Sequence, residues 1–287
     1  MPEFCFRSGR LTLTGHTVVM GILNVTPDSF SDGGRYFQPQ QAADRARQMA
    51  DEGAGMIDIG AQSTRPGHVP VSAGEEWRRL EPALRAVRAA VSLPLSVDTY
   101  YPEVARASME IGADIINDVS GSEENDMAGV AVQTGAGLIL MHAGGGADDD
   151  GRGENAAEAV RAYFLRAIKM AERAGLPLSR ICLDPGIGFG KGRKGDLLLT
   201  ARLPELLQGL PEVAVLFGAS RKRVTAAFST AEGGDPVPFD QRLGGTIAIH
   251  TAAQLGGAHI LRVHDVAPAV QAARLIDALC KLKGEGV

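Results

Sequence analysis

The chain has 287 residues, of which 45% are hydrophobic and 22% are charged. These fractions are typical of soluble globular proteins, so the composition excludes a chain that is disordered throughout. The net charge of −5 is opposite in sign to the basic surface of a general nucleic-acid binder. We therefore expect no nucleic-acid partner, and any site for an anion has to be local.

Membrane and secreted classes are not indicated either. No run reaches the roughly 20 apolar residues that span a bilayer, and the start MPEFCFRSGR lacks the apolar core of a signal peptide. Three widely separated cysteines argue against a disulfide framework or a clustered zinc site. We expect a cytoplasmic protein without a membrane partner.

Eight apolar runs alternate with longer segments of helical composition. Between Val18 and Ala258 the runs begin about every 34 residues, which is the length of a βα unit. Their apolar residues are continuous rather than alternating, and this favours the strands of a parallel sheet that is covered on both faces. The predicted strands are 18–26, 56–60, 93–99, 114–120, 137–142, 181–186, 213–220 and 258–264.

Glycines mark the ends of three predicted helices. Gly53, Gly112 and Gly175 each follow a helical segment, where glycine adopts the left-handed conformation that ends a helix. The predicted helices include 40–52, 75–90, 102–111, 156–174, 246–255 and 268–281. We predict one α/β domain over residues 1–287, a (β/α)8 TIM barrel whose bottom is closed by an N-terminal β-hairpin around Ser8-Gly9.

Polar residues stand at or just beyond the carboxyl end of each predicted strand. In a TIM barrel the catalytic residues come from these ends, which meet at one mouth. Each residue taken singly is also explained as a turn or cap residue, but their coincidence at one rim indicates a functional site. They are Asn24, Ser63-Thr64-Arg65, Asp98, Asn117, His142, Asp184, Ser220 with Lys222, and Arg262 with His264.

Two chemical groups can be distinguished at this rim. The anion group combines fixed cations, an imidazole and an oxygen ligand, which suit a phosphate held with a divalent metal. Its members are Asn24, Arg65, Arg262 and His264. The ring group combines acceptors and donors that suit the edge of a guanidine-like heterocycle. Its members are Asp98, Asn117, Asp184 and Lys222.

A glycine-rich segment supports a flat ligand. In Asp-Pro-Gly-Ile-Gly-Phe-Gly, residues 184–190, glycines let the backbone and the ring of Phe189 approach such a ligand closely. The alternative is an ordinary glycine turn with Phe189 in the core. No nucleophile elbow, zinc-protease motif, Walker A loop or dinucleotide fingerprint occurs in the chain, so these chemistries are not indicated.

Several longer blocks recur together in the chain. They are MGILNVTPDSFSDGG from Met20, STRPG from Ser63, SVDT from Ser96, INDVSG from Ile116, MH at Met141, DPGIGFGK from Asp184, SRK from Ser220, GT at Gly245 and RVHDV from Arg262. In this order they are highly specific, and over nearly its whole length the chain resembles the dihydropteroate synthase family of the folate pathway.

The resemblance implies a transferase that joins 6-hydroxymethyl-7,8-dihydropterin diphosphate to 4-aminobenzoate, releases diphosphate and requires Mg²⁺. It also implies a homodimer. The implied pterin pocket consists of Asp98, Asn117, Asp184 and Lys222, with Met141, Gly188 and Phe189 as its walls. The implied diphosphate and metal site consists of Asn24 as the metal ligand with Arg65, Arg262 and His264.

For the second substrate, the resemblance implies a pocket at Thr64, Arg65 and Pro66 and at the loop 28–34, where sulfonamides also bind in this family. The implied catalytic residues are Asp98, Lys222, Arg262 and His264. If the bond to diphosphate breaks first, the electron-rich dihydropterin stabilises the cation on the methylene carbon. No covalent nucleophile is then required, and none is evident.

Departures from the family pattern fall beside these residues rather than on them. Gln62 replaces a common Glu, the segments 143–153 and 192–196 differ, Arg223 follows Lys222, and 226–227 is Ala-Ala.

Two alternatives stay open. A methyltetrahydrofolate–corrinoid methyltransferase has a related barrel but no need for the STRPG and RVHDV blocks, and a non-catalytic paralogue would bind pterins without turnover.

Overall fold

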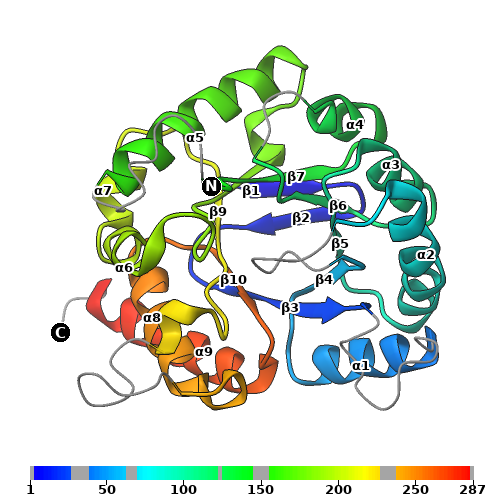
Figure 1. Ribbon diagram of the computed structural model, residues 1–287. Coiled ribbons are helices and arrows are strands. Elements are labelled where there is room, and N and C mark those ends of the chain that lie inside the picture. Colours follow the sequence, from blue (N-terminus) through cyan, green and yellow to red (C-terminus); the bar gives the residue numbers. More distant parts are fainter. Residues whose placement is uncertain are drawn as a thin grey trace.

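The computed structural model describes residues 3–26, 39–62, 70–121, 125–144, 155–226 and 237–284. Eight parallel strands form a closed barrel in the order β10-β3-β4-β5-β6-β7-β8-β9 (Figure 1). They are β3 (Val18–Asn24), β4 (Met56–Gly60), β5 (Leu95–Asp98), β6 (Ile115–Asp118), β7 (Gly137–Met141), β8 (Ile181–Asp184), β9 (Ala214–Phe217) and β10 (Ile260–Val263). Each lies inside a predicted run, so the predicted TIM barrel is confirmed.

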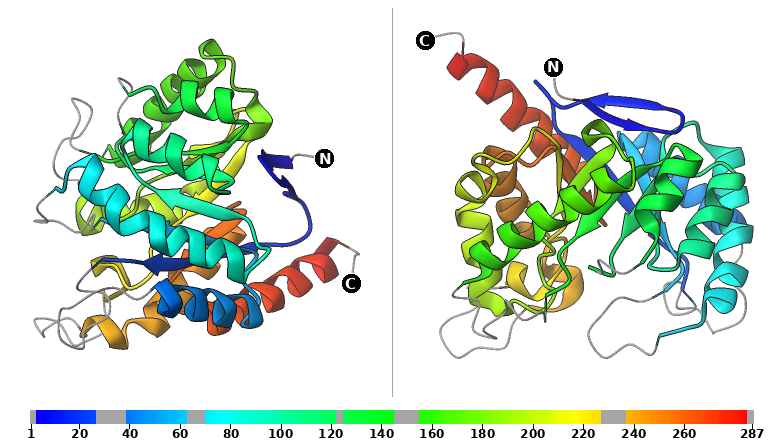
Figure 2. Two further views of the ribbon diagram at one scale, coloured as in Figure 1. Left: turned by 90° about the vertical axis from the view of Figure 1, so that its right-hand side faces the viewer. Right: turned by 90° about the horizontal axis from the view of Figure 1, so that it is seen from above.

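Helices follow the strands and surround the barrel (Figure 2). They are α1 (Pro39–Asp51), α2 (Ala73–Ala90), α3 (Pro102–Glu110), α4 (Met127–Thr134), α5 (Ala156–Arg173), α6 (Gly192–Ala201), α7 (Leu203–Leu207), α8 (Leu243–Leu255) and α9 (Val266–Gly284). The predicted helices are confirmed with shifted ends, and α8 begins three residues before the predicted start at Thr246. Helices α4, α6 and α7 were not among the predicted ones. Helices α4 and α7 have only 8 and 5 residues, and α6 contains Gly192 and Gly195 in its first turn, which are unfavourable in a helix.

The glycines predicted to end helices adopt the required conformation. Gly53, Gly112 and Gly175 have φ values of 95°, 105° and 93°. A side chain in this left-handed region is strained, so these positions favour glycine. They turn the chain from the helices toward the next strands.

The N-terminal hairpin closes the bottom of the barrel, as predicted. Strand β1 (Glu3–Phe6) pairs antiparallel with β2 (Gly9–Thr12). Phe4 and Phe6 are buried against the lower barrel interior, whose residues include Val18, Met20, Met56, Ile115, Ile139, Cys182 and Ile260. A Cβ at Gly137 would lie 2.8 Å from the Phe4 ring, so the start of β7 has no room for a side chain.

The barrel interior changes from apolar to polar toward the carboxyl ends of the strands. Along β4, Met56 belongs to the apolar floor, whereas Ile57 and Ile59 pack outward against the helices. Polar side chains above the floor are buried, namely Asp58, Ser96, Asp98, Asn117 and Asp184. A buried polar layer requires partners or a ligand, because unpaired polar groups in an interior are costly.

No helix within the described ranges is long and apolar enough to span a membrane.

Candidate active site

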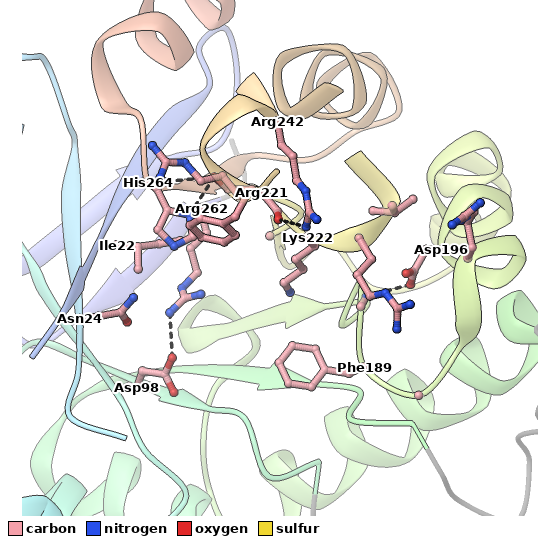
Figure 3. Close-up of a pocket in the computed structure, with 18 of the residues that line it drawn as sticks. Ile22, Asn24, Asp98, Phe189, Asp196, Arg221, Lys222, Arg242, Arg262 and His264 are labelled. Carbon is pink, nitrogen blue, oxygen red and sulfur yellow. Dashed lines mark hydrogen bonds and ion pairs between the residues drawn. The ribbon is translucent and has the colours of Figure 1, made fainter. Parts of the chain in front are cut away.

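A cavity of ≈ 990 Å³ opens at the carboxyl ends of the barrel strands. Members of both predicted groups line it, as does the glycine-rich segment. These lining residues are Asn24, Asp98, Gly188, Phe189, Lys222, Arg262 and His264. Figure 3 shows Asn24 and Asp98 on one side, Phe189 on another, and Lys222 and Arg262 beside them. The fold therefore brings the anion group and the ring group to the same mouth.

The other residues of the predicted pterin and 4-aminobenzoate pockets fall into two sets. Asn117, Met141 and Asp184 are 2%, 2% and 5% exposed and belong to the barrel interior beneath the cavity. They stand in register with their neighbours, Asn117 opposite Asp98 and Met141 opposite Asp184. Thr64, Arg65 and Pro66, like the loop 28–34, lie outside the described residues, so their predicted roles stay predictions.

Arg262 contacts the ring group, although the sequence placed it in the anion group. Its Nη2 donates to Oδ2 of Asp98 at 2.7 Å, and its Nε donates to Oδ2 of Asp58 at 2.6 Å. Burial lowers the pKa of Arg262, but the two carboxylates outweigh this effect and the pKa lies above its ordinary value. Arg262 is therefore a fixed cation that joins the two groups.

The acids of the ring group are buried. Burial raises the pKa of Asp98, and the nearby guanidinium of Arg262 opposes this shift. Burial also raises the pKa of Asp184, whose Oδ1 accepts a hydrogen bond from the backbone nitrogen of Gly186 at 2.7 Å. Both carboxyl groups are therefore poised to bind a ligand that donates hydrogen bonds or carries positive charge.

Lys222 is the cation of the ring group and lines the cavity. Its Nζ lies 4.5 Å from the centre of the Phe189 ring and donates to the carbonyl oxygen of Ile187 at 2.5 Å. Burial lowers its pKa to about 8, against the opposing charge of Asp184. Gly188 has a φ of 83°, and a Cβ there would lie 2.8 Å from Cδ of Lys222. Glycine is thus required where the backbone approaches the lysine.

Lys191 holds the glycine-rich segment in shape. It is 2% exposed, and its Nζ donates to the carbonyl oxygens of His142, Gly186 and Phe189, each at 2.9 Å. These contacts join the segment after β8 to the end of β7. The block DPGIGFGK includes this lysine, but its role was not predicted, because lysines are mostly exposed in proteins.

The cavity also has a basic side that the sequence did not predict. Arg221 has a φ of 57°, donates to Oδ2 of Asp265 at 2.9 Å and lies 5.3 Å from the centre of the Phe239 ring. Ser220 Oγ accepts a hydrogen bond from the backbone nitrogen of His264 at 3.1 Å and lies 3.0 Å from its Nδ1. The two contacts with Ser220 orient the imidazole of His264 at the cavity wall.

Gln62 joins the cavity to a buried acid. Its Oε1 accepts from the backbone nitrogen of Val71 at 2.7 Å, and its Nε2 lies 3.5 Å from Oε2 of Glu76. Glu76 is on the buried face of α2, one turn before Leu80, and is 0% exposed. Burial raises the pKa of Glu76 to about 7. The amide of Gln62 thus places no second negative charge beside this acid.

Among the described residues, sequence reasoning missed three buried acids of this region, Asp58, Glu76 and Asp196. Asp196 lines the cavity, and its Oδ1 accepts from the backbone nitrogen of Gly188 at 2.8 Å. An acid inside the apolar run MIDIG was a signal for Asp58, because a charged residue in a buried strand needs a partner. Glu76 had no such signal, since it falls among the charged residues of an amphipathic helix.

For a metal, the described residues offer few ligands. Within them no group of three or more His, Cys, Asp or Glu side chains could hold an ion. Asn24 ends β3 and lines the cavity, so its amide oxygen is one donor of the hard type that Mg²⁺ prefers.

Comparison with known proteins agrees with this site. A model of the family described as pterin binding enzyme matches residues 20–264. Dihydropteroate synthase of Escherichia coli (strain K12) is 39% identical over 282 residues, which cover 97% of each protein.

Solved structures extend the similarity to three dimensions. Dihydropteroate synthase of Xanthomonas albilineans, solved with 4-aminobenzoic acid, has a TM-score of 0.88 and 39% identity, and the match covers 97% of this chain and 98% of that one. Dihydropteroate synthase of Yersinia pestis, solved as a sulfonamide drug complex, has a TM-score of 0.86 and 36% identity, with coverage of 97% and 99%. The chain belongs to the dihydropteroate synthases, which are pterin-binding transferases.

Proposed function

We propose that this protein joins 6-hydroxymethyl-7,8-dihydropterin diphosphate to 4-aminobenzoate, forming 7,8-dihydropteroate and diphosphate. The observation that carries the proposal is the shared cavity, in which a buried acid, a half-buried lysine and an aromatic ring lie beside a fixed arginine and a histidine. A flat, hydrogen-bonding ring and the anion attached to it thus have adjacent subsites.

The ring end of the substrate would occupy the ring group. Carboxylates of Asp98 and Asp184 accept hydrogen bonds from ring nitrogens, and Lys222 donates to a ring carbonyl or nitrogen. Phe189 lies next to Lys222 and provides an aromatic face for stacking. Because the acids are buried, their negative charge favours a pterin that becomes cationic as the bond to diphosphate breaks.

The departing diphosphate would lie toward Arg262 and His264. The guanidinium keeps its charge, and the imidazole is held in orientation by Ser220. Positive groups fixed in place before the reaction stabilise the charge that collects on the leaving oxygen. The amine of 4-aminobenzoate then forms a bond to the methylene carbon and loses a proton, and no enzyme nucleophile takes part.

We propose Mg²⁺ as the cofactor, with Asn24 as its protein ligand. The donor set fits, because Mg²⁺ commonly takes one or two protein oxygens and completes its coordination with water and substrate phosphates. When bound, the ion would neutralise negative charge on the diphosphate. Removal of the ion with a chelator is expected to abolish turnover, and re-addition of Mg²⁺ to restore it.

For 4-aminobenzoate we propose contacts with Thr64, Arg65 and Pro66, and competition by sulfonamides. This proposal is supported by the Xanthomonas albilineans relative solved with 4-aminobenzoic acid and the Yersinia pestis relative solved with a sulfonamide drug. A competitive inhibition pattern against 4-aminobenzoate would support a shared subsite, whereas a noncompetitive one would contradict it.

We also propose that two copies of the chain form a homodimer. Helices α8 and α9 pack against each other and carry large apolar side chains that are exposed. These are Leu255, Leu275, Leu279 and Leu282, which are 58%, 61%, 47% and 53% exposed. Contiguous exposed apolar surface is typical of an interface. Light scattering coupled to gel filtration would give the mass of a dimer, and a monomer mass would contradict the proposal.

The decisive experiment measures diphosphate release from the two substrates with and without Mg²⁺. The proposed function predicts release only with both substrates and the ion, and Arg262→Ala should lower turnover by on the order of 10²-fold. Methyl transfer to a corrinoid would instead indicate the methyltransferase. Pterin binding without turnover would indicate the non-catalytic paralogue.

A further inference from the structure

We propose that Asp58 is a positioning residue that fixes both Arg262 and Asn117 from beneath the cavity. This inference rests on the proposed function, because it assigns the pterin and diphosphate subsites a common support. Asp58 itself is not among the residues that line the cavity.

The position of Asp58 is unusual for a carboxyl group. It stands in the middle of β4, opposite Ile22 of β3 and Ser96 of β5, and its side chain is 0% exposed. Met56, two residues earlier, belongs to the apolar floor of the barrel. A buried carboxylate above an apolar floor is costly unless partners hold it.

One oxygen of Asp58 binds a residue from each predicted group. Its Oδ2 accepts from Nε of Arg262 at 2.6 Å and from Nδ2 of Asn117 at 3.1 Å. These residues come from β10 and β6, so the carboxylate joins strands that are not neighbours in the barrel. Asp58 thereby sets the distance between a ring-binding amide and the cation proposed to receive diphosphate.

The contact with Asn117 decides which end of the amide faces a ligand. A carboxylate only accepts hydrogen bonds, so it selects the NH₂ end of Asn117. The opposite atom, Oδ1, is buried and has no hydrogen-bond partner among the described residues. We infer that Oδ1 of Asn117 is presented as an acceptor for a ring N–H or NH₂ of the pterin.

The contact with Arg262 has a different consequence. Arg262 is shared between Asp58 and Asp98, and of these two acids only Asp98 lines the cavity. A bound ring can therefore compete with Arg262 for Asp98. Asp58 is 0% exposed and its Oδ2 is already bound by Arg262 and Asn117, so its bond to Arg262 can persist. The bond to Asp58 keeps the guanidinium in place while Asp98 exchanges its partner for the substrate.

The test compares Asp58→Asn with Asp114→Asn. Asp114 is a matched control because it is also a buried acid, 3% exposed, with an arginine partner, Arg88 at 3.4 Å. It accepts from the backbone nitrogen of Leu95 at the start of β5, at the opposite end of the barrel from the cavity. Both substitutions remove one buried negative charge and nearly preserve shape.

Asp58→Asn is expected to lower kcat/KM for the pterin diphosphate by roughly 10- to 100-fold, the range for loss of a charge-assisted hydrogen bond. Asp114→Asn should change kcat/KM by less than about twofold, because it is distant from the site. Calorimetric binding of the pterin ring without diphosphate should also weaken in Asp58→Asn, through the misoriented amide of Asn117. A purely structural role for Asp58 would lower the melting temperature of Asp58→Asn and leave both of its functional readouts intact, which would overturn the inference.

A double-mutant cycle keeps the test decisive if Asp58→Asn folds poorly. Asp58→Asn combined with Arg262→Gln removes the acid together with its cationic partner, so the cycle isolates the coupling between the two residues. In the Arg262→Gln background, Asp58→Asn should reduce the residual kcat/KM by clearly less than it does in the wild type. Full additivity of the two effects would overturn the inference. Absence of dihydropteroate formation by the wild-type protein would instead refute the proposed function.

Discussion

Replacement of Glu76 by glutamine should stabilise the protein, and only at a pH where the acid is ionised. Glu76 is 0% exposed and its Oε1 has no hydrogen-bond partner among the described atoms. Burial raises the pKa of its carboxyl group from 4.5 to about 7. Glutamine has nearly the same shape and avoids the cost of a buried charge.

The sign and size of the effect follow from the two pKa values. The unfolded chain releases the proton near pH 4.5 and the folded protein near pH 7, so the folded state loses stability as pH rises through this window. The full shift corresponds to about 3 kcal/mol in the free energy of unfolding. Part of this shift lies below pH 5, so we expect about 2 kcal/mol between pH 5 and pH 8.

Thermal unfolding at both pH values provides the assay. The melting temperature of Glu76→Gln should exceed that of the wild type by about 4 °C or more at pH 8, with a much smaller difference at pH 5. Glu81→Gln is a suitable control, because Glu81 lies on the same helix and pairs with Arg85 at the surface. A difference between Glu76→Gln and the wild type that is equal at both pH values would refute the reasoning, since it could not come from ionisation of Glu76.

Three further predictions concern the site and the barrel floor. Lys222 carries its positive charge only when protonated, and burial lowers its pKa to about 8. The kcat/KM for the pterin should therefore fall as pH rises through about 8. The fall should move to higher pH in Lys222→Arg, and an unmoved profile would exclude Lys222 as its source. Lys191→Met removes the Nζ that donates to three carbonyl oxygens and should reduce the free energy of unfolding by about 3 kcal/mol in urea titrations. A loss below about 1 kcal/mol would contradict its role in the loop. Phe4→Ala opens a cavity in the barrel floor and should lower the free energy of unfolding by about 3 to 5 kcal/mol, with little change in kcat. A large loss of kcat at unchanged stability would be inconsistent with a role in the floor.

The spacing of the strands and the side chains at their ends were predictable because they depend on local pattern. A βα repeat brings the carboxyl ends of all strands to one rim, whatever the detailed packing. Asp98, Lys222, Arg262 and His264 could therefore be assigned to one mouth from their positions after the apolar runs, and all four line the cavity. The order of the blocks was equally sufficient to predict the family.

The pairing of charges within the mouth depended on tertiary structure. Arg262 was predicted to face an anion, yet its bonds are to Asp58 and Asp98, because register in the closed barrel brings β10, β4 and β5 within reach of its long side chain. The burial of Glu76 likewise depends on which face of α2 packs against the barrel. Sequence by itself determined which polar residues arrive at the rim, since strand ends are a local property; only the folded barrel decided their partners, because hydrogen bonds and pKa shifts depend on distances between segments remote in the chain.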